Sequence, residues 1–304
     1  MKLQDLHILM AVVQAGSMSK AASLLNTGQS AISRSIADLE QAIGVRLLDR
    51  NAMGVAPTVY GRTLLEGGAA VFGELRQAVK RIEFLADPAA GEVRIGCSPL
   101  LAPSFVSAVV DRISRRYPRI EFQLLSAPVE TTLLELDRRN VDLLIARKSG
   151  PIADERLNFE FLFKDSLVIV AGARHPWAKR RKIAPAELAG QLWVLPPPEY
   201  VLGMDIMNAF HAKGLEYPRA RVGTVSPEVR MSLAATGRFL TIFPASALRF
   251  PIERPELKVL PIELPMASVP NGIVTLKNQT LSPVTQLFIE QAREVAKTVA
   301  SRNG

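Results

Sequence analysis

Residues 17–58 read SMSKAASLLNTGQSAISRSIADLEQAIGVRLLDRNAMGVAPT and predict a helix, a tight turn, a second helix and a short hairpin. The turn falls at residues 26–28, because Asn and Gly accept the backbone angles that a sharp turn needs. Apolar residues recur at three- and four-residue spacing on both sides of it, which predicts one buried face for each helix. The predicted buried positions are Ala21, Ala22, Leu24 and Leu25 in the first helix, and Ala31, Ile32, Ile36, Leu39 and Ile43 in the second.

Polar side chains gather at the start of the second helix, at Gln29, Ser30, Ser33 and Arg34. In a helix-turn-helix this end of the second helix enters the major groove of DNA. The side chains suit that task, since Gln pairs with adenine, Arg with guanine or phosphate, and Ser with either. These residues are therefore candidate DNA contacts, although an Ala-rich helix pair with a Gly turn also occurs in helical domains of other function.

This stretch resembles the winged helix-turn-helix of the LysR-type transcriptional regulators, and the similarity continues over the whole chain. The resemblance implies an α + α/β fold: an N-terminal winged helix-turn-helix, a linker helix, and a C-terminal two-subdomain α/β effector domain like a periplasmic binding protein. It is carried by Leu9, Met10, Val12, Val13, the run GSMSKAA, Gln29, Ala31, Ser33, Arg34, Leu39, Glu40, Gly44, Val45, Leu47, Leu48, Arg50, Thr58 and Gly61.

The chain departs from the family pattern at three places. Gly28 stands where a Ser cap is common, and Ser30 stands where Pro is common. The wing, residues 51–56, lacks the basic residues that relatives usually carry, so its contacts with phosphates should be weaker. Arg50 is the one wing cation that we expect to contact DNA.

The composition of the 304 residues, 48% hydrophobic and 22% charged, is that of an ordinary globular protein. No apolar run approaches a membrane span, the amphipathic N-terminus is unlike a signal peptide, and the single cysteine, Cys97, excludes an intrachain disulfide. We therefore expect a cytoplasmic protein without membrane contact. The net charge of +8 does not itself indicate DNA binding, because residues 1–58 hold five basic and four acidic side chains.

Residues 59–86 predict one long helix, and its apolar residues follow the alternating spacing of a coiled coil. Periodicity alone leaves open whether this helix packs on its own domain, whereas the resemblance favours a dimer-forming linker. The predicted seam is Leu64, Gly68, Val71, Leu75, Ala78, Ile82 and Leu85. Residues 86–91 then predict a hinge. The expected domains are 1–58 for DNA binding, 59–91 for the linker and 92–304 for the effector domain.

From residue 92 onward strands and helices alternate, which is typical of an α/β fold. Expected strands are 93–97, 120–125, 141–146, 167–171, 192–195, 219–224, 239–243 and 272–276, with helices near 102–117, 129–139, 203–213, 226–236 and 283–300. Residues 159–170 and 268–275 resemble the family's crossovers between two subdomains. The first subdomain is then 92–164 with 269–304, and the second is 165–268.

The sequence gives no sign of catalysis. The histidines His7, His175 and His211 lack metal-site spacing, and there is no phosphate-binding loop or nucleophile elbow. Cys97 has no histidine partner at a meaningful spacing, so we expect a buried side chain and not a nucleophile. We expect no catalytic residue, no metal and no cofactor.

Open α/β sheets bind ligands beyond the carboxyl ends of their strands, near helix N-termini that favour anions. This rule predicts an effector site at Ser98, Pro99, Leu100, Leu101, Val129, Arg147, Pro197, Pro198, Glu199 and Ser226. Relatives often place Ser or Thr where Leu100 stands, which weakens the case for a simple carboxylate. Arg147 favours an anionic ligand, unless its charge is used in a salt bridge with a neighbouring helix. Glu199 disfavours an anionic ligand, because its carboxylate would repel it. We expect an anionic metabolite in preference to a neutral polyol or sugar.

The sequence is thus interpreted as a regulator that binds double-stranded DNA as a homodimer or homotetramer and responds to a small molecule, with RNA polymerase as a candidate partner. Two alternatives are a solute-binding protein of transport and an enzyme on the same scaffold. The absence of an export signal and the presence of residues 1–86 oppose the first, and the absence of a catalytic set opposes the second. The effector, the operator and target genes, and the choice between activation and repression are not encoded in any visible motif.

Overall fold

The computed structural model describes residues 1–304 except 52–53, 88, 149–153, 250–253, 263–267 and 304. The chain forms two compact units. The first comprises Met1–Val79 with Asp137–Arg139, and the second comprises Lys80–Leu136 with Asn140–Gly304. The division falls inside the long helix, between Val79 and Lys80, and the two units are described separately below.

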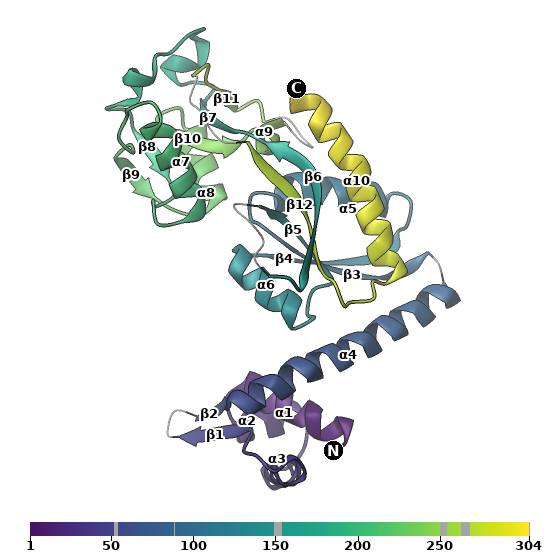
Figure 1. The fold of residues 1–304 in the computed structure, drawn as a ribbon. Coiled ribbons are helices and arrows are strands. Elements are labelled where there is room, and N and C mark those ends of the chain that lie inside the picture. The colour runs from purple at the N-terminus through teal and green to yellow at the C-terminus, as the bar shows by residue number, and fades with distance from the viewer. Residues whose placement is uncertain (52–53, 88, 149–153, 250–253, 263–267, 304) are drawn as a thin grey trace. The chain divides into compact units, whose positions relative to one another are not determined.

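The first unit is a helical domain with a two-stranded wing. Its core joins side chains of the first three helices to Leu47 and Leu48 at the start of the wing. Ser17 caps the second helix by accepting a hydrogen bond from the Lys20 amide at 3.1 Å. The elements are α1 (Leu3–Ala15), α2 (Met18–Leu24), α3 (Gln29–Ile43), β1 (Leu48–Asn51), β2 (Gly54–Pro57) and α4 (Val59–Ala86), shown in Figure 1.

The predicted helix pair is confirmed, with corrections at three predicted core positions. Ile32, Ile36 and Leu39 are buried as expected. Leu24 is 66% exposed and Ile43 is 41% exposed, because each lies at the end of its helix, where the chain turns away from the core. Ala31 is also exposed. The buried face of α3 is therefore narrower than the periodicity predicts.

The long helix α4 has the bounds that the sequence predicts, but its seam divides into two parts. Leu64 packs against the core of the first unit, and a Cβ on Gly68 would lie 3.0 Å from the Leu6 side chain. This N-terminal part therefore packs on its own domain. Further along, the apolar side chains lie open to solvent. The exposed ones, with their exposed fractions, are Val71 (43%), Leu75 (48%), Val79 (52%), Ile82 (66%) and Leu85 (80%). We call these five residues the α4 stripe.

The second unit contains two five-stranded sheets, one in each of two subdomains. The first sheet has the order β4-β3-β5-β12-β6, and the second has the order β11-β7-β10-β8-β9. The strands are β3 (Ala90–Cys97), β4 (Arg119–Ser126), β5 (Leu143–Arg147), β6 (Leu157–Asp165), β7 (Leu167–Gly172), β8 (Trp193–Leu195), β9 (Ala220–Gly223), β10 (Leu240–Pro244), β11 (Leu257–Val259) and β12 (Val269–Leu276).

Helices cover both faces of the first sheet. In Figure 1, α5 and α10 lie side by side, and both contribute to the large core of the first subdomain. On the other face, Leu133 and Leu136 of α6 pack with side chains of β5 and β12. The remaining helices are the π-helical turn η1 (Ala102–Val106), α5 (Ser107–Ser114), α6 (Val129–Asp137), the 3₁₀ turns η2 (Pro176–Lys179) and η3 (Pro185–Leu188), α7 (Val201–His211), α8 (Pro227–Ala235), α9 (Ser246–Arg249) and α10 (Pro283–Asn303).

Most predicted elements of the second unit are present, although the short elements β11, η2, η3 and α9 were not expected and one predicted crossover differs. The predicted crossover at 159–170 is two strands, because β6 ends at Asp165 in the first sheet and β7 begins at Leu167 in the second. β12, the other predicted crossover, lies antiparallel to both β5 and β6. The predicted hinge contains Pro88, which is outside the described residues; α4 ends at Ala86 and β3 begins at Ala90. Among the helices of the described residues, none is long and apolar enough to cross a membrane.

Candidate DNA-binding and effector sites

The start of α3 presents its polar side chains to solvent. Asn26 in the preceding turn has a left-handed φ of 50°, and Gly28 has the extended conformation of an N-cap. Gln29, Ser30 and Arg34 are exposed, and Ser33 is half-buried. The turn predicted at this point is thus confirmed, and all four predicted contacts lie within the first two turns of the helix.

Two hydrogen-bonded contacts hold α3 in place. The Glu40 carboxylate accepts hydrogen bonds from the Leu47 amide at 2.7 Å and the Leu48 amide at 3.1 Å, which ties α3 to the wing. The Ser35 hydroxyl donates to Asp5 of α1 at 2.9 Å. Neither contact uses a residue from the polar end of α3, so the side chains at that end remain accessible to solvent.

The wing is short and fits closely against the first helix. β1 and β2 are antiparallel, with Arg50 opposite Val55, and Arg50 is exposed. The Val55 amide donates to the Gly16 carbonyl at 3.0 Å. Gly54 has a φ of 128°, and a Cβ there would lie 2.7 Å from the same carbonyl oxygen. The wing tip, Ala52 and Met53, lies outside the described residues.

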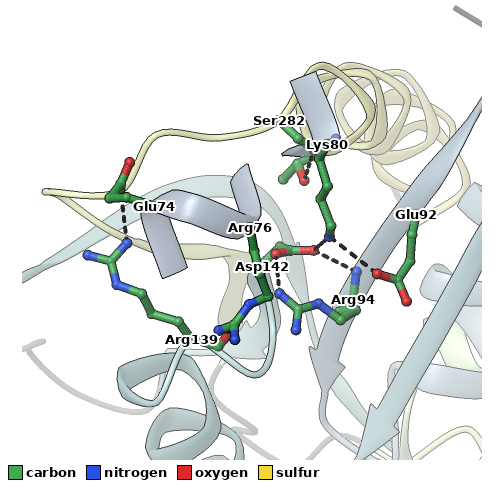
Figure 2. A network of polar contacts seen from close by, with 9 residues as sticks. Glu74, Arg76, Lys80, Glu92, Arg94, Arg139, Asp142 and Ser282 are labelled. Carbon is green, nitrogen blue, oxygen red and sulfur yellow. Dashed lines mark hydrogen bonds and ion pairs between the residues drawn. The ribbon is translucent and has the colours of Figure 1, made fainter. Parts of the chain in front are cut away.

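The second unit holds the end of α4 through a buried carboxylate, Asp142, which directly precedes β5. Figure 2 shows Lys80 and Arg94 converging on it. Lys80 Nζ lies 2.9 Å from Asp142 Oδ2, and Arg94 Nη2 lies 3.0 Å from Oδ1. The Arg94 amide also donates to Oδ2 at 2.9 Å, and Glu92 lies 3.6 Å from the Lys80 ammonium.

The pKa of Asp142 reflects these partners. Burial acts to raise it, since the side chain has no exposed surface, but the charges of Lys80 and Arg94 and their hydrogen bonds outweigh burial and lower the pKa. The carboxylate is therefore ionised and fully paired. β5 thus carries an ionic anchor for α4 at one end and Arg147 at the other.

Arg147 joins the two subdomains of the second unit. Its Nη2 lies 3.2 Å from Oδ2 of Asp205 on α7, so the salt bridge considered from the sequence is present. The exposed fractions of the side chains are 12% for Arg147 and 24% for Asp205. Burial lowers the pKa of the Arg147 guanidinium, against the attraction of Asp205 and Asp165.

The other predicted effector residues of the first subdomain differ in their surroundings. Ser98 and Pro99 follow β3 and are half-buried. Leu100 packs against an apolar cluster of the second subdomain. Leu101 is 1% exposed and lies in the core of the first subdomain, so its side chain supports the site and does not line it. Val129 begins α6 and packs on the other face of the first sheet. It lies there with Leu133 and Leu136 of α6 and with apolar side chains of β5, β6 and β12, a group that we call the α6 cluster.

The second subdomain contributes the loop after β8 and the start of α8. Pro198 and Glu199 are exposed and Pro197 is half-buried. The loop packs tightly on α7, since a Cβ on Gly203 would lie 2.2 Å from the Pro197 carbonyl oxygen. Ser226 caps α8: its hydroxyl accepts from the Val229 amide at 3.2 Å and donates to Glu228 at 2.8 Å. Its hydroxyl is therefore committed to the helix.

The structure gives Cys97 a structural role. Burial raises the pKa of its thiol to about 11, so the reactive thiolate is scarce at neutral pH. In the described part of the chain, no group of three or more His, Cys, Asp and Glu side chains could hold a metal ion.

Sequence reasoning missed Asp142, Asp165, Asp205 and Asn271. Asp165 ends β6 and accepts hydrogen bonds from the Ser246 amide and hydroxyl at the start of α9. Asn271 is opposite Arg147 in the β5–β12 pair. For three of them, Asp142, Asp165 and Asn271, the available signal was a charged or amide residue within two positions of the end of a strand. Asp205 gave no signal, because it is one polar residue on an amphipathic helix.

Comparison with known families shows to which family the chain belongs. The family model "LysR substrate binding domain" matches residues 86–297, and "Bacterial regulatory helix-turn-helix protein, lysR family" matches residues 3–62. The chain belongs to the LysR family of bacterial transcriptional regulators. Its fold class, a DNA-binding helix-turn-helix domain joined to an effector-binding domain, is that of the family, whose members are regulators and not enzymes.

Relatives and solved structures agree over the full length. The transcriptional regulator GbpR of Azospirillum brasilense is 25% identical over 99% of this chain and 89% of its own length. The dual regulator GltC of Bacillus subtilis is 27% identical, covering 95% and 96%. A full-length OxyR variant from Pseudomonas aeruginosa has a TM-score of 0.72 at 17% identity, covering 98% of this chain and 97% of that one. CbnR, described as a LysR family transcriptional regulator, has a TM-score of 0.67 at 20% identity, covering 97% and 99%.

Proposed function

We propose that this LysR-family regulator reads DNA through the N-terminal end of α3. Gln29, Ser30, Ser33 and Arg34 would contact base edges or phosphates, and Arg50 would contact the backbone from the wing. The observation that carries this proposal is the separation of faces on α3. Its apolar side chains are buried in the core, while the polar residues of its first two turns remain accessible.

We infer that two copies pair through the α4 stripe. Contiguous apolar side chains on one helix face are costly in water, and a second copy of the same stripe covers them with matching spacing. A homodimer, or a homotetramer made of two dimers, would place α3 helices in successive major grooves of a pseudo-palindrome, roughly 34 Å apart. Such a protein acts where the chromosome is, in the cytoplasm, and RNA polymerase is a candidate partner.

We propose that the effector binds between the two subdomains of the second unit. The residues that support this placement are Ser98, Pro99, Leu100 and Arg147 on one side, and Pro197, Pro198, Glu199 and Ser226 on the other. Leu101 and Val129 would support the part of the site that the first subdomain contributes, because both pack within that subdomain. An effector that carries a carboxylate fits better than a neutral polyol or sugar, because Arg147 joins the subdomains through an ionic contact that a carboxylate can take over.

A gel-shift titration tests the DNA-reading proposal. The duplex is selected from random sequences by the wild-type protein, and Arg34→Ala is compared with Arg181→Ala, which removes an equal charge from an exposed position in the second unit. Arg34→Ala should weaken specific binding by about 1–3 kcal/mol, as for loss of a base contact. Arg181→Ala should bind as wild type. Equal affinities of a folded Arg34→Ala variant and the wild type would disprove the assignment.

A further inference from the structure

The polar groups around Arg147 are unbalanced in charge. One guanidinium faces two carboxylates, since Asp205 is 3.2 Å away and Asp165 attracts the same group electrostatically. The next cation in the chain does not make up the difference. Lys148 has its ammonium 5.0 Å from the centre of the Phe159 ring, which packs with the α6 cluster on the other face of the sheet. Asp205 and Asp165 therefore share the positive charge of Arg147.

Strand register places a further acceptor beside Arg147. Asn271 of β12 is paired with Arg147 on one side and with Phe163 of β6 on the other. Paired residues in a sheet share a face, and Asp165, two residues beyond Phe163, shares that face as well. Arg147, Asn271 and Asp165 thus lie together at one end of the first sheet.

Two buried atoms at this end have no hydrogen-bond partner among the described residues. One is Asn271 Oδ1, an acceptor, on a side chain that is 1% exposed. The other is Ser98 Oγ, a hydroxyl, at the end of β3, where the Ser98 amide donates to Ile145 of β5. Buried polar atoms are nearly always paired, so an unpaired acceptor next to Arg147, together with an unpaired hydroxyl at the end of the neighbouring strand β3, indicates a missing ligand.

Burial acts on both carboxylates. Burial raises the pKa of Asp205, and the charge of Arg147 only partly offsets it. Burial likewise raises the pKa of Asp165, against hydrogen bonds from Ser246 and the attraction of Arg147. A carboxyl group with a raised pKa gains from an added cation nearby.

We propose that the effector is a zwitterion of the α-amino acid class, with its carboxylate on Arg147 and Ser98 and its ammonium on Asp205 and Asn271. This inference rests on the proposed effector site between the subdomains. On binding, Arg147 and Asp205 separate, and each takes the opposite end of the ligand. One ion pair becomes two, so neither Arg147 nor Asp205 is left without an opposite charge in a buried place, and Asp165 keeps its hydrogen bonds from Ser246.

Other ligand classes satisfy the site less well. A monocarboxylate can take Arg147, but it leaves the Asp205 carboxylate unpaired next to a second anion. A polyol supplies no charge to either partner once their ion pair is broken. Of these three classes, the amino acids offer both a carboxylate for the cation and a cation for the carboxylates.

Calorimetric titration of the full-length protein tests the proposal. The probes are the twenty common L-amino acids and, for each that binds, the 2-hydroxy acid with the same side chain. At least one amino acid should bind, and its hydroxy acid should bind about ten- to a hundredfold more weakly, because the charge-assisted contact with Asp205 is lost. The two ligands differ only in the group that faces Asp205, so the comparison isolates the ammonium.

Variants of the two partners give separate signatures. Asp205→Asn should lower the affinity for the amino acid about ten- to a hundredfold and reduce the difference in affinity between the amino acid and the hydroxy acid. Asp205→Glu should keep that difference. Arg147→Gln should lower the affinity for both ligands. Glu187→Gln is the control, since it removes an exposed ion pair with Arg180 elsewhere in the second subdomain and should leave binding unchanged.

Three results would overturn the proposal: equal binding of the amino acid and its hydroxy acid, unchanged amino-acid binding by folded Asp205→Asn, or no binding of any amino acid to the wild type. Gel shifts on the same preparations decide the regulator proposal independently. A protein that binds its selected DNA and responds only to a metabolite without an ammonium group would remain a regulator and would refute the zwitterion.

Discussion

Asp142→Asn should destabilise the second unit strongly, because it removes a buried charge that two cations share. The carboxylate has no exposed surface, and it lies within 3.0 Å of both Lys80 and Arg94. Asn has almost the same shape, so the substitution opens no cavity. It leaves Lys80, whose side chain is 10% exposed, with Glu92 at 3.6 Å as its remaining acidic partner in the network. It also places the NH2 group of the new amide, which cannot accept a hydrogen bond, against one of the two cations.

The size of the effect follows from the burial of the group. Breaking a buried ion pair by removing one partner costs about 3–5 kcal/mol. Because Lys80 can turn toward Glu92 and solvent, we expect a loss near the lower end, about 3 kcal/mol. That is a large share of the roughly 5–15 kcal/mol that stabilises a typical protein.

The effect should depend on pH in a defined direction. The pKa of Asp142 is lowered in the folded state, so the ionised group stabilises the fold above its unfolded pKa of about 4, and this contribution is lost as pH falls through the lower folded value. The difference between wild type and Asp142→Asn should therefore be constant from neutral pH to about pH 4 and shrink below it.

Urea unfolding followed by tryptophan fluorescence provides the assay. The two tryptophans, Trp177 and Trp193, both lie in the second unit, so the signal reports its unfolding in the full-length protein. Asp154→Asn is the control, because it breaks an exposed ion pair with Arg156 in the same unit and should leave the midpoint unchanged. A midpoint for Asp142→Asn equal to that of the wild type at neutral pH would refute the anchor.

Three further outcomes are expected. Leu75→Glu should weaken self-association in sedimentation experiments, because it places like charges in the middle of the α4 stripe; an undiminished oligomer would argue against the stripe as the interface. Gly54→Ala should lower DNA affinity and the Tm of the first unit, since a Cβ would lie 2.7 Å from the Gly16 carbonyl oxygen at a left-handed φ, and wild-type values would contradict this. Cys97 should react with a thiol reagent only when the protein is unfolded, because burial raises its pKa to about 11; rapid labelling of the native protein would show otherwise.

The sequence was sufficient for the elements whose signals are local. The apolar spacing and polar start of α3 placed it correctly, and α4 matches its predicted bounds. Periodicity wrongly predicted that Leu24, Ala31 and Ile43 are buried, because burial near a helix end depends on the direction that the chain takes beyond the helix. The short strand β11 was missed, since three residues carry too little pattern to be distinguished from a loop.

The candidate effector site could be predicted only in part. The rule on strand ends pointed to Ser98 and Arg147, which the effector proposal also uses, because their positions follow from the strands themselves. It could not find Asp205, which lies 58 residues beyond Arg147 and meets it only after the two subdomains come together. It also placed Leu101 at the ligand, although that side chain turns into the core. Which residue after a strand faces the ligand is decided by tertiary packing.

Base-pair scanning of the selected operator with wild type and Arg34→Ala shows whether the start of α3 reads base edges. Each base pair is substituted in turn, and affinity is measured by gel shift. The wild type should lose affinity at defined positions related by the two-fold symmetry of the site. Arg34→Ala should lose discrimination at one symmetry-related pair of positions and keep it at the others. Full discrimination at every position by Arg34→Ala would contradict the account.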